Sequence, residues 1–191
     1  MSAPSSDRSP ILTVGYGSSP PDTFVRLLQE AGVEYLIDVR SKPYSRYKPE
    51  FNREALDARL AAESIRYVFM GDLLGGLPSD RSCYTDGKVD YEKCRAKAFH
   101  RKGLDRLRSA HEQGLTVALM CACTKPEKCH RAKLVGVSLE REGLPVAHLD
   151  RQGRIHDHAV VMGRLNTAPD LFGHMAEAAT SRKRYLPDDD Q

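Results

Sequence analysis

Residues 115–131 read LTVALMCACTKPEKCHR, and the fold that we expect for this chain follows from this stretch. Its first seven residues are almost wholly apolar, which is typical of a β-strand buried on both faces and too short for a membrane helix. Thr124 is followed three positions later by Glu127, with a proline between them, and this spacing is typical of the start of a capped helix. The sequence therefore predicts a buried strand that leads directly into a helix ending near Glu142.

Alternating strand and helix patterns continue on both sides of this stretch. Apolar or β-branched runs predict further strands at residues 11–14, 34–39, 65–70 and 144–149. Apolar residues at helical spacing predict helices at 22–31 and 53–63, and a helix over 91–111 that is interrupted or bent near Gly103. This alternation predicts an α/β fold: a single three-layer domain with a mainly parallel sheet and helices on both faces.

The chain of 191 residues has the length of one domain, and it contains no internal repeat. We expect a mobile Ser/Pro-rich leader at 1–10, one α/β domain at 11–180 and a loosely held charged tail at 181–191. The less regular parts are then loops at 71–76 and 77–92, an ambiguous segment at 156–165 and a helical pattern at 170–180.

Composition and charge exclude some classes of protein. No apolar run approaches the roughly 18 residues that cross a membrane, so we expect no membrane partner. The polar N-terminus lacks the apolar segment of a secretory signal, and five cysteines in such a chain are typical of reduced thiols, so we expect a cytoplasmic protein. A formal net charge of +3 is too small to indicate nucleic acid by itself. No dinucleotide fingerprint is present, and we expect no cofactor; the oligomeric state is left open.

The carboxyl ends of the predicted parallel strands share one edge of the sheet, and ligands bind at that edge in open α/β folds. The helix predicted after residue 124 would point its positive dipole end at Cys121 and Cys123. A thiol in this field has a lowered pKa, so some thiolate is expected near neutral pH. The loops that we expect to meet around one cleft are 15–19, 40–47, 71–76 and 121–124.

The sharpest hypothesis is a thiol-containing anion site, serving an enzyme or a redox-responsive sensor for a phosphorylated or carboxylated compound. Its candidate catalytic residues are Cys121 as the reactive thiol, His130 as its base, and Asp38 as an acid/base or the partner of an arginine. Guanidinium groups bind phosphate and carboxylate through paired hydrogen bonds, and a phenol donates to an oxyanion. The candidate ligand-binding residues are Tyr16, Ser18, Arg40, Lys42 and Arg131.

Other interpretations of the cysteines stay open. Cys121 and Cys129 are alternatively small packing residues, with the arginines in structural ion pairs. A disulfide between Cys129 and Cys121 or Cys123 would make a redox-responsive pair. Four soft or borderline ligands also suit zinc, but Cys129 and His130 at adjacent helical positions point about 100° apart, so we predict no metal site. The His-Asp-His triplet at 156–158 is expected to be a polar pair near a turn.

A different class of function is indicated by residues 40–53, where basic and aromatic side chains alternate. Basic residues beside aromatic ones combine phosphate contacts with base stacking in proteins that bind single strands. The alternative to small-anion chemistry is therefore a nucleic-acid-binding module, whose affinity would fall steeply with salt. The side chains concerned are Arg40, Lys42, Tyr44, Arg46, Tyr47, Lys48, Phe51 and Arg53.

Four segments together resemble the family called domain of unknown function 488. They are TVGYGS at 13–18, LIDVR at 36–40, DLLGG at 72–76, and Cys121 followed eight residues later by CHR at 129–131. The resemblance covers roughly residues 11–158 and implies a compact α/β domain without a settled reaction. Cys123 stands where members tend to carry an acidic or polar residue, and Tyr16 stands where many carry histidine. A role that needs histidine at position 16 is therefore not expected here.

Overall fold

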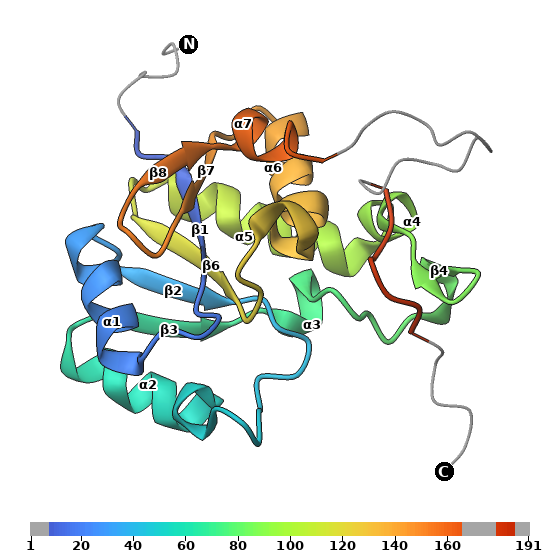
Figure 1. Ribbon diagram of the computed structural model, residues 1–191. Helices are drawn as coiled ribbons and strands as arrows, with labels where there is room; N and C mark the ends of the chain where they lie inside the picture. Colours follow the sequence, from blue (N-terminus) through green and yellow to red (C-terminus); the bar gives the residue numbers. More distant parts are fainter. Residues whose placement is uncertain (1–7, 166–178, 186–191) are drawn as a thin grey trace.

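A six-stranded sheet organises the computed structural model of this chain, which describes residues 8–165 and 179–185 (Figure 1). Its strands are β1 (Ile11–Gly15), β2 (Tyr35–Asp38), β3 (Arg66–Phe69), β6 (Val117–Cys121), β7 (Val146–Leu149) and β8 (Ile155–Asp157). Across the sheet they lie in the order β3-β2-β6-β1-β7-β8. The first five are parallel, and β8 is antiparallel to β7.

Helices cover both faces of this sheet (Figure 1). One face packs against α1 (Pro21–Glu30) and α2 (Arg53–Ala62), and the other against α5 (Ala98–Glu112) and α6 (Val137–Arg141). Side chains of β6 alternate between the two cores: Leu119 and Cys121 pack on the α5 side, and Met120 on the α1 side. The apolar run therefore becomes a strand buried on both faces, and the predicted three-layer α/β fold with a mainly parallel sheet is confirmed.

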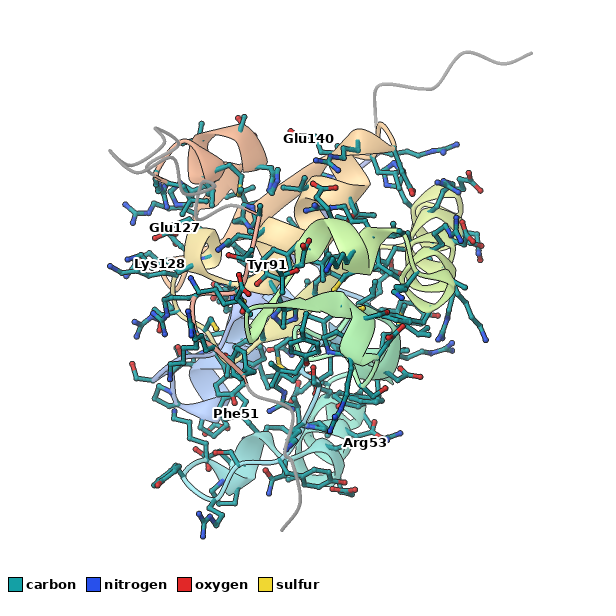
Figure 2. The ribbon with its side chains drawn as sticks, turned by 90° about the vertical axis from the view of Figure 1, so that its right-hand side faces the viewer. Phe51, Arg53, Tyr91, Glu127, Lys128 and Glu140 are labelled. Atoms are coloured by element: carbon teal, nitrogen blue, oxygen red, sulfur yellow. The ribbon has the colours of Figure 1, made fainter. Side chains whose placement is uncertain are left out.

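Shorter elements complete the described part of the chain. A small hairpin, β4 (Tyr84–Thr85) with β5 (Lys88–Val89), precedes α4 (Tyr91–Arg95), and Figure 2 looks onto the side of the molecule that carries them. The π-helix η4 (Arg131–Gly136) leads into α6. The others are α3 (Gly71–Leu74), α7 (His158–Met162) and the 3₁₀ turns η1 (Pro49–Phe51), η2 (Arg81–Cys83) and η3 (Pro126–Lys128).

The order of the strands determines where a site can form. The chain leaves β2 toward α2 on one face, and it leaves β6 toward η4 and α6 on the other. Because these two neighbouring strands send their connections to opposite faces, an opening forms at their carboxyl ends. Asp38 ends β2 and Cys121 ends β6 at this opening.

The prediction of one unbroken helix from residue 124 to residue 142 is wrong. Thr124 caps no helix; its hydroxyl lies against Gly17, where an added Cβ would be 2.7 Å from Oγ1. The chain instead forms η3, then an extended residue at Cys129 (φ −118°, ψ 145°), then η4 and α6. π-Helical segments are rare and are found frequently at functional sites.

Two other local predictions are also corrected. Residues 71–74 form α3 and not a loop, and the expected interruption of the helix over 91–111 lies at Lys97 and not near Gly103. Lys97 has extended dihedrals (φ −83°, ψ 143°). Gly103 lies inside α5, where a Cβ would be 2.6 Å from Cδ2 of Leu74, so its role is to let α3 pack closely.

The ends of the chain are only partly described. Residues 1–7 of the predicted leader, 170–178 of the predicted C-terminal helix and 186–191 of the predicted tail lie outside the described residues. The ambiguous segment 156–165 contains the end of β8 and then α7. Within the described ranges, no helix is long and apolar enough to cross a membrane.

Candidate functional site

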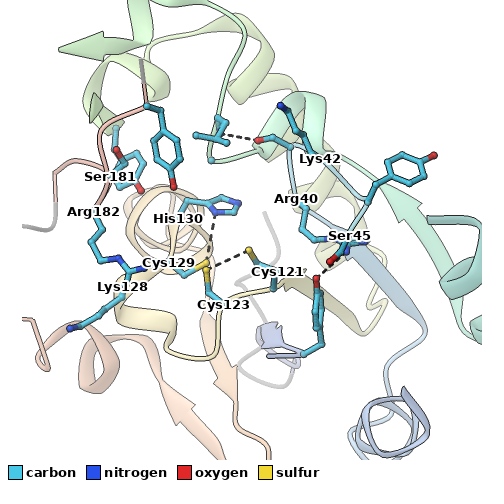
Figure 3. A pocket seen from close by; sticks show the side chains of 18 residues that line it. Arg40, Lys42, Ser45, Cys121, Cys123, Lys128, Cys129, His130, Ser181 and Arg182 are labelled. Carbon is cyan, nitrogen blue, oxygen red and sulfur yellow. Dashed lines mark hydrogen bonds between the residues drawn. The ribbon is translucent and has the colours of Figure 1, made fainter. Parts of the chain in front are cut away.

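A cavity of about 380 Å³ lies at the carboxyl end of β6, bordered by residues 40–45, the loop after β6 and residues 181–185 (Figure 3). This volume is in the range of sites that bind small molecules. Lys42, Lys128 and Arg182 are exposed and line it, and none of its described lining residues is acidic. An excess of positive charge in a concave site favours an anionic occupant.

Three thiol groups converge at this cavity. Cys121 is only 6% exposed, and its Sγ lies 4.0 Å from Sγ of Cys123, which is exposed. Cys129 is buried, and the three sulfur atoms all lie within 4.8 Å of one another (Figure 3). The cleft expected around Cys121 is therefore present, and it holds more than one thiol.

His130 is the imidazole beside these thiols. Its Nδ1 lies 3.7 Å from Sγ of Cys129, and its Nε2 donates to the carbonyl oxygen of Val39 at 2.9 Å. The expectation that Cys129 and His130 diverge is wrong, because Cys129 is an extended residue before η4 and not part of a helix. Since the carbonyl of Val39 holds Nε2, Nδ1 is the nitrogen that faces sulfur.

Hydrogen bonds and charge make Cys121 the most acidic of the three thiols. Hydrogen bonds from Cys123 and Cys129, together with the charge of His130, lower the pKa of Cys121 well below its ordinary value despite burial. Hydrogen bonding to Cys121 raises the pKa of Cys123, and burial raises that of Cys129. Burial by itself would lower the pKa of His130, but the charge of Cys121 raises it. The pair therefore favours a thiolate on Cys121 and an imidazolium on His130.

Arg40 lines the cavity but is held by an internal ion pair. Its Nε donates to Oδ1 of Asp38 at 2.9 Å, and its Nη2 donates to Oδ2 at 2.5 Å. Its Nη1 donates to the hydroxyl of Tyr16 at 3.3 Å, and the Tyr16 ring stacks on Phe51 with centroids 4.1 Å apart. Asp38 is fully buried and does not line the cavity. Its place is therefore behind Arg40, as a partner that orients the guanidinium.

Arg131 and Ser18 lie outside the cavity. Arg131 is 2% exposed, and its Nη1 donates to the carbonyl oxygen of Cys123 at 2.5 Å. It therefore holds the loop that carries Cys123 and does not line the cavity. This loop lies so close to β1 that a Cβ at Gly15 would be 1.9 Å from the same oxygen. Ser18 is exposed, and its hydroxyl accepts a hydrogen bond from Arg151.

The pairing of β1 with β6 continues past the ends of both strands. The N–H of Tyr16 donates to the carbonyl of Cys121 at 3.2 Å, and the N–H of Gly17 donates to that of Ala122 at 3.2 Å. These bonds place the Tyr16 side chain at the same cavity as Cys121.

The C-terminal segment 179–185 contributes to the cavity, and this contribution was not predicted from the sequence. The N–H of Ser181 donates to the carbonyl of Val89 at 2.9 Å, and that of Tyr185 donates to the carbonyl of Gly87 at 2.5 Å. The segment is therefore docked on the β4–β5 hairpin, and the expectation of a loosely held tail is wrong for residues 181–185 (Figure 1). The only sequence signal was its basic-aromatic composition, SRKRY. The side chains that it brings to the cavity are Ser181, Arg182 and Tyr185.

The histidines of the 156–158 triplet separate. Nε2 of His156 bonds to Oδ2 of Asp150 at 2.8 Å, and His156 is half-buried beside a turn. His158 is 3% exposed, and its Nδ1 bonds to Nε2 of His148 at 2.8 Å. The polar position near a turn that was expected for both histidines is therefore found only for His156, and neither residue lines the thiol cavity.

The thiols are also the residues best placed to hold a metal. In the part of the chain that the structure describes, Cys121, Cys123 and Cys129 form the one group of three potential ligands this close together. Zinc takes thiolates at about 2.3 Å, which places tetrahedral sulfurs roughly 3.8 Å apart. A small contraction of the cluster would reach that spacing. The group is thus suited both to free-thiol chemistry and to a thiophilic metal.

Comparison with known proteins gives a family but no chemistry. A family model described as "Domain of unknown function DUF488" matches residues 20–138, more than half of the 191-residue chain. The matched region contains all three clustered cysteines. No curated protein and no solved structure matches the chain.

Proposed function

This chain belongs to the DUF488 family, whose description assigns no reaction, and we propose its function from the site itself. The protein is a thiol-dependent enzyme in which the Cys121 thiolate attacks an electrophilic atom of a small anionic compound. The observation that carries this proposal is the convergence of Cys121 with Lys42 and Lys128 on a cavity that has no acidic side chain among its described lining residues.

Position supports a separate role for each neighbour of Cys121. Thiols attack as thiolates, and the lowered pKa of Cys121 favours that form near neutral pH. His130, held by Val39, is placed to stabilise the thiolate and to give a proton to the departing group. Tyr16 and Arg40 offer donors to the anion at fixed positions, because Asp38 and Phe51 hold them.

The compartment that suits this chemistry is the cytoplasm. All five cysteines are free thiols. Cytoplasmic glutathione and thioredoxin keep thiols reduced, and Cys121 acts as a nucleophile only in that state.

Two alkylating reagents that differ in charge test the proposal. Neutral iodoacetamide is expected to modify Cys121 at about pH 6 at least tenfold faster than it modifies glutathione, because the thiolate persists there. The ratio of the iodoacetate rate to the iodoacetamide rate should be higher at Cys121 than at glutathione. Inorganic phosphate should slow both reactions at Cys121. Rates are measured by mass spectrometry with assignment of the modified cysteine.

Controls for this experiment lie within the same chain. Cys94 is buried in the core with a raised pKa, and it should stay unmodified. In the double variant K42M/K128M, the preference for iodoacetate should fall while the iodoacetamide rate is kept. If Cys121 titrates like glutathione and phosphate changes nothing, the proposal fails; it fails also if metal analysis finds one zinc per chain that must be removed before Cys121 reacts.

A second candidate function, single-stranded nucleic-acid binding, is favoured by the exposed tyrosines of the 40–53 loop. Tyr47 is 91% exposed and Tyr44 is 58% exposed, next to the basic residues Lys42 and Arg46. Exposed aromatic rings among cations are the arrangement on which bases stack.

The change R46A/Y47A is expected to weaken binding of a fluorescent single-stranded oligonucleotide at least tenfold, because stacking contributes about 1–3 kcal/mol per base. Binding is measured by fluorescence anisotropy over a range of salt concentrations. The control is K102A, on the exposed surface of α5, which should leave the affinity unchanged. Equal affinities for all three proteins would rule out this loop as the binding surface.

A further inference from the structure

Nucleophilic attack needs only the Cys121 thiol, but this site also holds a second thiol, Cys123, close to Cys121. Cys123 is exposed, lines the same cavity, and has its Sγ 4.0 Å from Sγ of Cys121. A disulfide requires the two sulfur atoms to approach to about 2.05 Å. Rotation of the Cys123 side chain about its Cα–Cβ bond brings Sγ closer to Cys121 while its carbonyl oxygen stays on Arg131, so the loop backbone keeps its place.

We propose that Cys123 is the resolving thiol of Cys121 and that the protein reduces small anionic disulfides. This inference rests on the proposed function, in which Cys121 is the nucleophile. It adds the reaction class, a two-electron reduction, and the substrate class, an organic disulfide that carries carboxylate or phosphate groups.

The electrons and protons balance in two exchanges. The Cys121 thiolate attacks one sulfur of the substrate; its S–S bond breaks, and the first product leaves as a thiolate that takes a proton from His130. His130, now neutral, takes the proton of Cys123, and the Cys123 thiolate attacks Sγ of Cys121 and breaks the mixed disulfide. The second product leaves as a thiolate and takes this proton from His130, so that it ends as a thiol. The protein has lost two electrons and holds a Cys121–Cys123 disulfide. A dithiol reductant, oxidised to its own disulfide, restores both thiols.

The cavity favours an organic disulfide over a peroxide. Hydrogen peroxide is small and neutral, whereas the cavity has a volume of about 380 Å³ and is lined by basic side chains. Tyr91 and Tyr185 add aromatic surface to the lining, which suits an organic group next to an anion.

Cys129 is a positioning residue in this scheme. It is 2% exposed, and its Sγ contacts Nδ1 of His130 at 3.7 Å and Nη1 of Arg131 at 4.0 Å. These contacts hold it in place beside the reacting pair, and its hydrogen bonding supports the thiolate of Cys121. The more exposed Cys123 is the thiol that is free to move.

The proposed exchange between Cys121 and Cys123 is tested with the aromatic disulfide DTNB. This compound carries two carboxylates and releases a coloured thiolate. The full-length protein is expected to release two equivalents of thiolate and to retain no adduct, with a mass two units lower than the reduced form. The variant Cys123→Ser should release one equivalent and keep the mixed disulfide on Cys121. Cys94→Ala is the matched control and should behave like the unchanged protein.

Each other outcome has a separate meaning. If the unchanged protein releases one equivalent and keeps the adduct on Cys121, the resolving role of Cys123 is overturned, but Cys121 is still the nucleophile. If Cys121 does not react with DTNB at all, both proposals fail. If Cys129→Ala and not Cys123→Ser traps the adduct, Cys123 is not the resolving thiol. If hydrogen peroxide oxidises the Cys121–Cys123 pair faster than glutathione disulfide does, the proposed substrate class is overturned.

Discussion

Replacing Arg40 with methionine is expected to lower the free energy of unfolding by about 3–5 kcal/mol, the range found when one partner of a buried ion pair is removed. The carboxylate of Asp38 is fully buried, and Arg40 supplies both of its closest ionic contacts, at 2.5 Å and 2.9 Å. Without the guanidinium, Asp38 keeps neutral donors, the hydroxyl of Tyr67 at 2.6 Å from Oδ2 and the N–H of residue 40 at 3.0 Å from Oδ1, which are too weak for a full buried charge. The measurement is urea unfolding followed by circular dichroism.

The matched control is Arg59→Met, which removes an ion pair with Asp22 on the surface. The side chains of Arg59 and Asp22 are 40% and 80% exposed, and such pairs contribute about 0–1 kcal/mol. The double variant D38N/R40M should recover part of the loss, because no unpaired charge remains. An equal, small effect of R40M and R59M would show that the buried pair is not the source of stability at this edge of the sheet.

Replacing His130 with glutamine is expected to slow iodoacetamide modification of Cys121 about tenfold at pH 6, because the pKa of the Cys121 thiol rises when the neighbouring positive charge is lost. The imidazolium stabilises the thiolate, and the raised pKa of His130 keeps it charged near neutral pH. Removing this charge raises the pKa of Cys121, so less thiolate is present at low pH. Above the ordinary thiol pKa both proteins are ionised, and the difference should disappear.

Glutamine keeps an N–H donor for the carbonyl of Val39, so the fold around the site is preserved. His156→Gln is the control, since His156 bonds to Asp150 and does not line the thiol cavity. The complete pH profile of the alkylation rate separates the two explanations of a slow variant. A uniform loss at every pH would point to altered access, and only a displaced profile supports the electrostatic role of His130.

Reactivity and stability are divided between neighbouring residues at this site. Asp38 and Arg131 are buried and hold other groups: Asp38 holds Arg40, and Arg131 holds the carbonyl of Cys123. Lys42 and Cys123 are exposed at the cavity. The buried charges fix the donors and the thiol loop, while the exposed groups are free to meet a ligand.

Several features of the site could be predicted because they depend on local patterns. The apolar run before Cys121 indicated a buried strand, and parallel strands place their carboxyl ends at one edge. Cys121, Arg40 and Tyr16 were expected at that edge and line one cavity there. The direction of Arg131 was not predictable, because its burial depends on the loop of Cys123 and on Gly15 from another strand.

The sequence by itself determined the α/β alternation, the strand that ends in Cys121 and the end of the sheet where a site would form, since hydrophobic periodicity and turn residues act over a few neighbouring positions. Only the tertiary structure decided that β6 lies between β1 and β2, that three thiols and His130 meet, and that residues 179–185 close one side of the cavity. These contacts join segments far apart in the chain. Their physical cause is the packing of the strands, the π-helix and the hairpin against one another, which no short window of sequence contains.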